Sequence, residues 1–248
     1  MMRRFARAAL LGLAAACALL PAATAPAASA AAPYKAVLIA GDGSLPVFDN
    51  AMDGVAADLR RAGAAAGIVR LSGTGAGRAL PATLGNVVEA IAAMHPAAGQ
   101  GCLVFATSHG VHGGGLYLSA EEEVLTPALL DRALQAGCGS APTAVVVSSC
   151  FSGAFAQPPM TRPNRVILTA ARVDRTSFGC GAGETYTVYD RCLLGRLDKR
   201  GTWPAAYDAI RVCVSAEERR EGVTPSLPQA WFGGGVAGLL LPTGPAAP

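Results

Sequence analysis

Two apolar segments of the chain lead directly into side chains that can do chemistry. Residues 102–107 read CLVFAT and lead to His109, and residues 144–148 read AVVVS and lead to Cys150. An imidazole close to a thiol lowers the pKa of the thiol and can carry a proton to a leaving group. If the two segments are neighbouring strands, His109 and Cys150 face one crevice, and they predict acyl transfer by a thiolate nucleophile.

The glycine after the histidine fits the same chemistry. Acyl transfer needs backbone N–H groups that bind the oxyanion, and we expect those of Gly110 and Cys150 to do so because Gly110 has no side chain in the way. The alternative is a structural histidine, a core or disulfide-bonded cysteine, and a flexible loop over residues 109–115, HGVHGGG. The position of both residues after consecutive strands favours the catalytic interpretation.

Alternating strands and helices must position these residues. Short apolar runs predict strands at residues 34–40, 67–71, 102–107, 144–148 and 166–169, and a sixth strand region at 231–241. Apolar positions at helical spacing predict helices from residue 50, after Thr83, from Thr126 to Gly137, and after Thr202. The alternation predicts an α/β fold in one domain over residues 31–248, with a mostly parallel central sheet of about six strands covered on both faces.

The first 30 residues are predicted to be a signal peptide. Three arginines stand before the apolar run Ala8–Leu20, and the small residues 28–30 form a cleavage signature. The apolar run is too short to span a bilayer. We therefore expect export to the periplasm or the extracellular space after cleavage near Ala30. The Ala/Pro-rich ends at residues 21–33 and 242–248 are expected to be disordered.

A membrane anchor or a lipoprotein is the alternative for this segment. Cys17 could carry a lipid, but Ala14 stands three residues before it, where a lipobox usually has Leu. No later segment is apolar for long enough to span a bilayer, so we expect no stable membrane partner.

Export changes how the cysteines are interpreted. Six remain after cleavage, and an oxidising compartment favours disulfides. Adjacent parallel strands bring their first residues together, which predicts a Cys102–Cys138 disulfide at the edge opposite the site. Cys192 and Cys213 lie in helical stretches late in the chain and are predicted to form a second disulfide, with Cys180 free. No C-x-x-C or H-E-x-x-H spacing occurs, so we expect no metal or cofactor.

Composition places the chain among globular proteins with a sizeable core. It has 248 residues, of which 52% are hydrophobic and 15% charged. The net charge is +3, and the 20 basic residues are scattered along the chain rather than clustered. We therefore expect a peptide or protein substrate as the partner, and no nucleic acid.

At its two motifs the chain resembles the legumain-like cysteine peptidases, which belong with caspases and include asparaginyl endopeptidases and the glycosylphosphatidylinositol transamidase subunit. The resemblance rests on a strand ending in His-Gly and a second strand ending in small-Cys with Ser-Gly after it. It extends over further segments: VLIAG at 37–41, LTAA at 168–171, SFGC at 177–180 and Thr185-Tyr186. It implies a caspase-like three-layer α/β sandwich with His109 and Cys150 as the catalytic dyad.

The chain departs from eukaryotic legumains around the substrate pocket. The acidic residue that they hold two positions before the nucleophile is Ser148 here, and their Arg-His pair falls on Asp49 and Asn50. An Asn that they hold near the catalytic His falls near Val47, so no third supporting residue is evident. The pocket residues that the resemblance suggests are Asp49, Asn50, Ser148, Thr176, Ser177 and Asp190. A pocket with two carboxylates and no arginine predicts a preference for Arg or Lys before the scissile bond.

Three functions are compatible with these residues. The leading hypothesis is an endopeptidase that hydrolyses a thioester on Cys150 with His109 as general acid and base. A transpeptidase or transamidase would use the same thioester and an amine in place of water. A non-catalytic binding module of the same fold is the third, and the presence of both His109 and Cys150 argues against it.

Overall fold

The computed structural model describes residues 33–75, 77, 79–181, 183–197 and 199–242. The predicted signal peptide with its cleavage site, Cys17 and almost all of the two Ala/Pro-rich ends lie outside these residues. In the described part of the chain, no helix is both long enough and apolar enough to cross a membrane.

The described residues form a seven-stranded central sheet, in the order β3-β2-β1-β4-β7-β8-β9. Every neighbouring pair is parallel except β8 and β9, which are antiparallel. The strands are β1 (Tyr34–Ala40), β2 (Ala65–Ser72), β3 (Leu80–Pro81), β4 (Gly101–Thr107), β7 (Thr143–Ser148), β8 (Arg165–Thr169) and β9 (Gln229–Phe232). The mostly parallel sheet is confirmed, and β3 is the strand that the sequence did not predict.

The two outer strands differ most from the prediction. β3 has only two residues, one of them a proline, so it has too few apolar positions to show a strand pattern. The last strand was predicted over 231–241, but β9 ends at Phe232 because residues 233–235 leave the ladder in a turn. The central strands agree closely because they are buried on both faces and read as continuous apolar runs.

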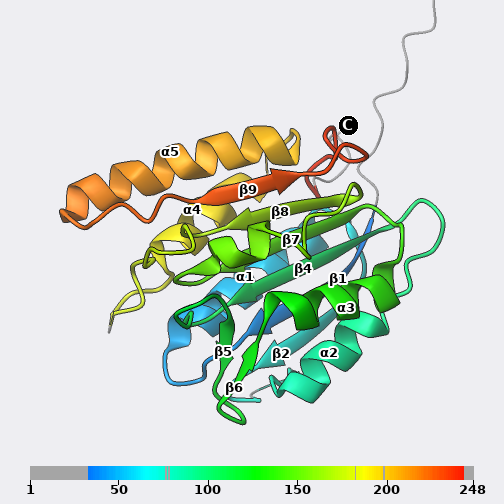
Figure 1. Cartoon of the computed structure of the whole chain (residues 1–248), viewed down its shortest axis with the longest axis horizontal. Coiled ribbons are helices and arrows are strands. Elements are labelled where there is room, and N and C mark those ends of the chain that lie inside the picture. The colour runs from blue at the N-terminus through cyan, green and yellow to red at the C-terminus, as the bar shows by residue number, and fades with distance from the viewer. Residues whose placement is uncertain (1–32, 76, 78, 182, 198, 243–248) are drawn as a thin grey trace, which may run out of the picture.

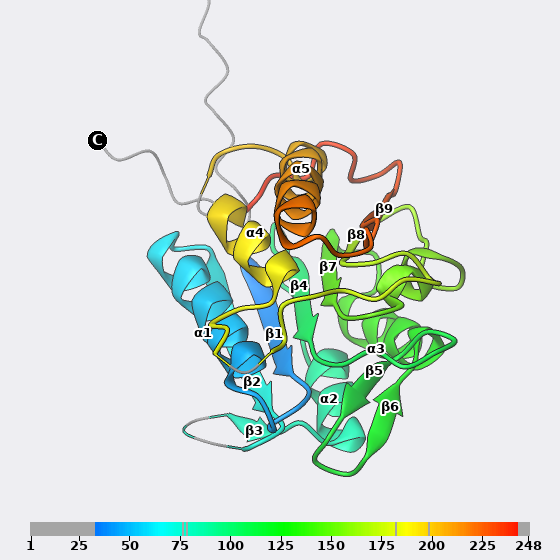
Figure 2. The same cartoon turned by 90° about the vertical axis from the view of Figure 1, so that its left-hand side faces the viewer.

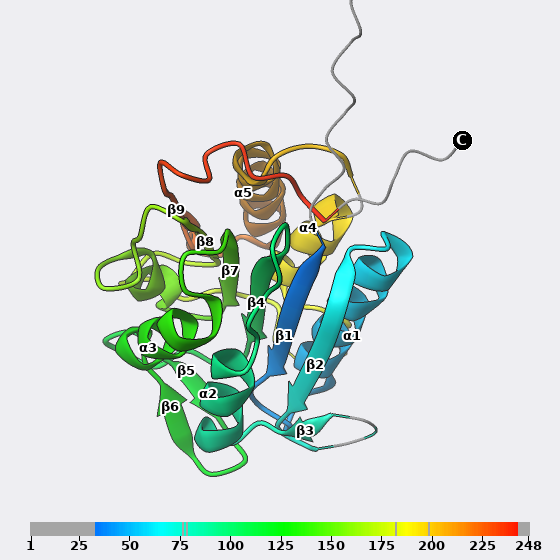
Figure 3. The same cartoon turned by 90° about the vertical axis from the view of Figure 1, so that its right-hand side faces the viewer.

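Helices cover both faces of the sheet, as Figures 1, 2 and 3 show from three directions. One face carries α1 (Pro46–Arg61), α4 (Val188–Leu197) and α5 (Trp203–Glu221). The other carries α2 (Leu84–Ala92) and α3 (Pro127–Cys138), with the hairpin of β5 (Leu116–Leu118) and β6 (Glu123–Leu125) beside them. The chain is therefore a three-layer sandwich, and each layer boundary is an apolar core.

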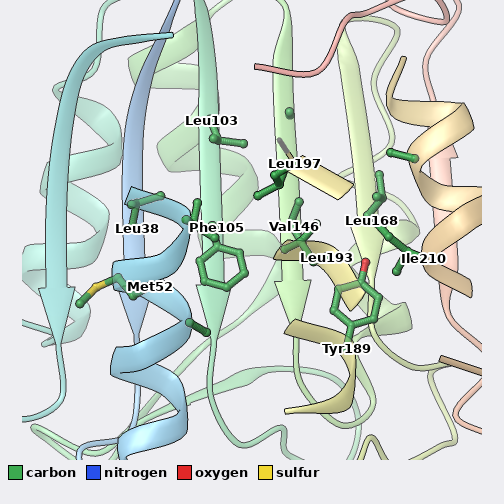
Figure 4. Close-up of a cluster of buried hydrophobic side chains, with 14 of the residues drawn as sticks. Leu38, Met52, Leu103, Phe105, Val146, Leu168, Tyr189, Leu193, Leu197 and Ile210 are labelled. Atoms are coloured by element: carbon green, nitrogen blue, oxygen red, sulfur yellow. The ribbon is translucent and has the colours of Figure 1, made fainter. Parts of the chain in front are cut away.

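The core under α1, α4 and α5 is the larger of the two apolar clusters. Figure 4 shows side chains of the sheet, such as Leu38, Phe105 and Leu168, meeting Leu193 and Ile210 of the helices. All five are at most 1% exposed. This packing places α4 over β4 and β7, the strands that end in the two motifs.

Three threonines begin the helices that the sequence predicts. The side-chain oxygens of Thr83, Thr126 and Thr202 accept hydrogen bonds from the backbone N–H groups that start α2, α3 and α5. Two boundaries differ slightly from the prediction. Helix α1 begins at Pro46 rather than near residue 50, because a proline suits a first helical turn, and α3 ends at Cys138, one residue later than predicted.

One disulfide joins the sheet to a helix, and a second joins two helices of the same layer. The first joins Cys102 at the start of β4 to Cys138 at the end of α3, with the Cα atoms 6.2 Å apart. The second joins Cys192 of α4 to Cys213 of α5, with the Cα atoms 5.8 Å apart. These are the pairs that the sequence predicts. Among the described cysteines, Cys150 and Cys180 are free.

A buried ion pair ties α3 to β8. The carboxylate of Asp131 accepts hydrogen bonds of 2.7 Å from Arg165 and 2.8 Å from Arg162. Arg165 is 2% exposed, so its charge depends on this partner. Hydrogen bonding from Arg162 is the largest cause that lowers the pKa of Asp131 below its usual value.

Removing that carboxylate should destabilise the fold. In Asp131→Ala the Arg165 guanidinium stays buried without a carboxylate partner and keeps its hydrogen bond to the Met160 carbonyl, so we expect the free energy of unfolding to fall by about 3–5 kcal/mol. The measurement is guanidinium-induced unfolding of the oxidised protein. The exposed pair of Arg172 and Asp174 supplies the control, since Asp174→Ala should leave the midpoint almost unchanged. Equal midpoints for the two variants would contradict this role for Asp131.

Candidate active site

The register of β4 and β7 brings the two motifs together. These strands are parallel neighbours, and Thr107 pairs with Ser148 at their carboxyl ends. His109 and Cys150 each follow two residues after that pair, so they leave the sheet side by side at its carboxyl edge. The Ser108 N–H donates a 3.2 Å hydrogen bond to the Ser148 carbonyl and continues the pairing beyond the strands.

Gly110 lies directly against the backbone of Cys150. A Cβ atom placed on Gly110 would lie 1.8 Å from the carbonyl oxygen of Cys150, a separation that no real Cβ can adopt. Any other residue would force the two motifs apart. The glycine in the His-Gly pair is therefore needed for the strand ends to approach each other.

The loop after β8 holds the thiol of Cys150. The Sγ atom accepts a hydrogen bond of 3.2 Å from the Ser177 N–H and lies 3.6 Å from the Ser177 carbonyl oxygen. Phe151 adopts a left-handed φ of 56°, which turns the chain sharply after the nucleophile. Its N–H donates a 2.8 Å hydrogen bond to the carbonyl of Arg175. The thiol is thus half-buried, free and fixed between two loops.

His109 lies beside a carboxylate that the sequence motifs do not indicate. Its Nε2 lies 3.6 Å from Oδ2 of Asp42, whose side chain is 7% exposed, whereas that of His109 is 41% exposed. The ring also meets the edge of Phe48, with centroids 5.3 Å apart and planes at 79°. The place near Val47, where the resemblance puts a supporting Asn, lies in the apolar core of α1. Asp42 follows β1 directly, and that position at a strand's carboxyl end was the available signal.

The structure brings four of the predicted pocket residues to partly exposed positions near the site. Asp49 and Asn50 lie in the first turn of α1, next to Phe48, and are partly exposed. The Asn50 side chain donates a 3.0 Å hydrogen bond to the Thr185 carbonyl, which ties this turn to the loop after β8. In that loop, Thr176 is exposed and Ser177 partly exposed.

The other two predicted pocket residues are buried. Ser148 is 2% exposed, and Asp190, in the first turn of α4, is 0% exposed. Burial raises the pKa of Asp190 to about 6, although the hydrogen bond from Thr107 and the nearby hydroxyls of Ser148 and Thr187 act in the opposite direction. Asp190 therefore lies beneath the molecular surface in this structure, while Asp49 is partly exposed in the first turn of α1.

Comparison with known families decides the identity of the chain. The model of the Peptidase C13 family matches residues 93–237, a segment that runs from before β4 to beyond β9 and includes both motifs. This chain belongs to the Peptidase C13 family. A comparison with curated proteins finds no match.

A solved structure described as "structure of pro-sf-caspase-1" is similar to this Peptidase C13 chain, with a TM-score of 0.56 and 12% sequence identity. The match covers 81% of this chain and 91% of that chain. At this identity the likeness establishes the fold, and the predicted caspase-like α/β sandwich is confirmed. Family and fold together make the chain a cysteine peptidase.

In this Peptidase C13 chain two backbone N–H groups beside the free thiol have no acceptor in the described part of the chain. Within the described residues, neither the Gly110 N–H nor the Cys150 N–H donates a hydrogen bond to another protein group. Both belong to the two backbone segments that touch at Cys150. A thiol, an imidazole and two unused N–H groups are the parts that attack on a carbonyl requires.

The close approach at Gly110 can be tested without a substrate. In Gly110→Ala the new methyl group must push the His109 and Cys150 segments apart, and displacements of about 1 Å commonly cost about 100-fold in rate. We expect alkylation of Cys150 by iodoacetamide, mapped by mass spectrometry, to slow at least about tenfold.

Gly181→Ala supplies the control for this substitution, because a Cβ there meets open space. It should react and unfold like the original protein. If Gly110→Ala also reacts at the original rate and unfolds at the original temperature, the two motifs do not touch as described.

Proposed function

We propose that this chain is an endopeptidase in which Cys150 is the nucleophile and His109 the general acid and base. The supporting observation is the parallel pairing of Thr107 with Ser148 in a Peptidase C13 chain, since His109 and the free Cys150 each follow that pair by two residues. No metal or cofactor takes part in this mechanism.

The proposed reaction has two steps that share one intermediate. The Cys150 thiolate attacks the peptide carbonyl, and the N–H groups of Gly110 and Cys150 bind the oxyanion. The C–N bond then breaks, the amine leaves with a proton from His109, and the acyl group remains as a thioester. In the second step His109 takes a proton from water, the hydroxide attacks the thioester, and the thiolate is released with a free carboxylate.

Asp42 is proposed to position the imidazole during both steps. Its carboxylate faces Nε2 of His109, which leaves Nδ1 as the nitrogen that exchanges protons with Cys150 and the leaving amine. A carboxylate there stabilises the imidazolium that accompanies the thiolate. The role of a third supporting residue therefore goes to Asp42.

A transpeptidase or transamidase is the second candidate, since an amine can attack the same thioester. Incubating the protein with a peptide substrate and hydroxylamine, glycine amide or water alone, followed by mass spectrometry of the products, separates the two. Hydrolysis is expected to dominate at millimolar amine. A binding module of the same fold would not react selectively at Cys150 with a peptide electrophile.

The substrates are proposed to be peptides or proteins outside the cytoplasm. Two disulfides link four of the described cysteines, and such bonds persist in oxidising compartments. The signal-like segment at residues 1–30 supports the same location. Export to the periplasm or the extracellular space follows from both observations as a proposal.

Substitution of the dyad tests the proposed chemistry. Cys150→Ala should abolish peptide turnover because the nucleophile is gone, and it should keep the fold because a small residue replaces a half-buried thiol. His109→Ala should lower kcat by about 10²–10⁴, the usual contribution of general acid–base catalysis. Turnover of fluorogenic peptides and circular dichroism are the measurements. Full activity of Cys150→Ala would exclude this assignment.

The residue preference before the scissile bond is proposed to be basic. Asp49 is partly exposed next to Phe48, which contacts His109, and within the described residues no Lys or Arg forms an ion pair with either Asp49 or Asp190. Thr74 approaches the Asp49 carboxylate only at 3.5 Å. A carboxylate in such a place favours a cationic side chain and disfavours an acidic one.

A set of fluorogenic peptides that differ only before the scissile bond tests this preference. We expect kcat/KM to be highest for Arg or Lys at neutral pH. Asp49→Asn should lower the ratio of the Arg to the Asn substrate about tenfold, which corresponds to about 1.4 kcal/mol. Asp53→Asn, one turn further along α1 and paired with Arg70, is the control and should keep the ratio. Best cleavage after Asn or Asp would show that the pocket is assigned wrongly.

A further inference from the structure

Asp190 is a buried carboxylate in an unusual setting. It is 0% exposed, and no cation is among the causes that shift its pKa, which burial raises to about 6. One of its oxygens, Oδ1, has no hydrogen-bond partner in the described structure. Burying a charged group in this way lowers the stability of the fold. The presence of a carboxylate at position 190 therefore points to a role other than stabilisation.

The contacts of Asp190 reach both catalytic strands. Its Oδ2 accepts a 2.8 Å hydrogen bond from the hydroxyl of Thr107, the last residue of β4. Its backbone N–H donates to the hydroxyl of Thr187, which lies 3.5 Å from the hydroxyl of Ser148, the last residue of β7. Asp190 and Thr187, at the start of α4, thus connect the end of β4 to the end of β7.

Those two strand ends carry the dyad. Thr107 and Ser148 are paired in the sheet, and His109 and Cys150 each follow two residues later. The Cys192–Cys213 disulfide begins one helical turn or less after Asp190 and anchors α4 to α5, so α4 can act as a fixed support. A movement of either strand end relative to α4 would change the separation of the imidazole and the thiol.

We propose that Asp190 is a positioning residue, which in its ionised form holds the ends of β4 and β7 so that His109 and Cys150 meet in reactive geometry. The proposal rests on the assignment of that dyad. Protonation would weaken the carboxylate as the acceptor for Thr107 and loosen the connection. The site should therefore lose activity as Asp190 takes up a proton.

Other titratable groups around Asp190 must be separated from this effect. The neighbouring Tyr189 and, from α5, Tyr207 have pKa values that burial raises, so both phenols stay neutral below pH 10. His109 after β4, Cys150 after β7 and Asp42, which faces His109, are further ionisable side chains near these strand ends. On the α1 side the first turn carries Asp49. Only a comparison with a neutral isostere isolates Asp190.

The test uses Asp190→Asn and Thr107→Val in the full chain, with the exposed Asp208→Asn on α5 as control. Iodoacetamide alkylation of Cys150 and peptide turnover are followed from pH 4.5 to 8. We expect both variants to lower kcat at least about tenfold with KM changed less than about twofold. Their effects should not add in the double variant, because both break one contact.

The pH profile of alkylation gives a signature that a merely structural role would not produce, and the pH dependence of stability tests the raised pKa independently. Alkylation of the original protein should fall as the pH drops through about 6, and this step should be absent in Asp190→Asn. A folded pKa above the unfolded one means that stability is lost as the pH rises through about 6. Asp190→Asn should therefore unfold at a higher midpoint than the original protein above pH 6 and at a similar midpoint near pH 4.

Two results would overturn the proposal. If Asp190→Asn raises KM and leaves kcat unchanged, Asp190 contacts the substrate. If Asp190→Asn keeps kcat and alkylation still falls as the pH drops through about 6, Asp190 has no role in positioning. A different result would show that the dyad itself is assigned wrongly. If Cys150 of the original protein is alkylated no faster than in His109→Ala, the proposed function is wrong irrespective of Asp190.

Discussion

The parallel pairing of β4 with β7 is the constraint on which the site depends. Both strands are buried on both faces, and their partners are fixed residue by residue from Cys102 and Thr143 to Thr107 and Ser148. A shift of one residue would turn every apolar side chain of a strand to the opposite layer, so burial enforces the register strongly. The positions of His109 and Cys150 thus follow from hydrophobic packing far below them. Polar contacts at the edge then adjust a geometry that the core has already set.

The polar layer above this core has a cost in stability that the fold must offset. Thr107, Ser148, Thr187 and Asp190 are all buried at the carboxyl edge of the sheet, where apolar side chains would be more favourable. The cores on both faces of the sheet and the two disulfides compensate for them. Such a division is common in enzymes, since residues that prepare a reaction are rarely those that stabilise a fold best.

Sequence patterns predicted the parts of the fold that burial determines. The strands from 34–40 to 166–169 appeared as continuous apolar runs, and the threonine caps marked three helix starts. Because β4 and β7 were expected to be neighbours, His109 and Cys150 could be predicted to lie at one edge of the sheet and Cys102 to pair with Cys138 at the other. β3 was not predicted because a strand of two residues is too short to show a hydrophobic pattern.

Two side chains of the site could not be placed from the sequence, for different physical reasons. Asp42 acts on His109 across β1 and β4, and such lateral proximity depends on the strand order rather than on spacing along the chain. Asp190 was expected to line a pocket, and the alternative for any Asp is an exposed loop. Its complete burial depends on how α4 packs over the sheet, which a helical pattern alone does not reveal.

The antiparallel strand β9 has a consequence for how the protein is made. It is formed by residues 229–232, which follow α5, and it covers the outer edge of β8. Until these residues have been synthesised, β8 has an open edge that can pair with other chains. The sheet can therefore be completed only after both α4 and α5 have been made, although β8 itself is formed by residues that precede them.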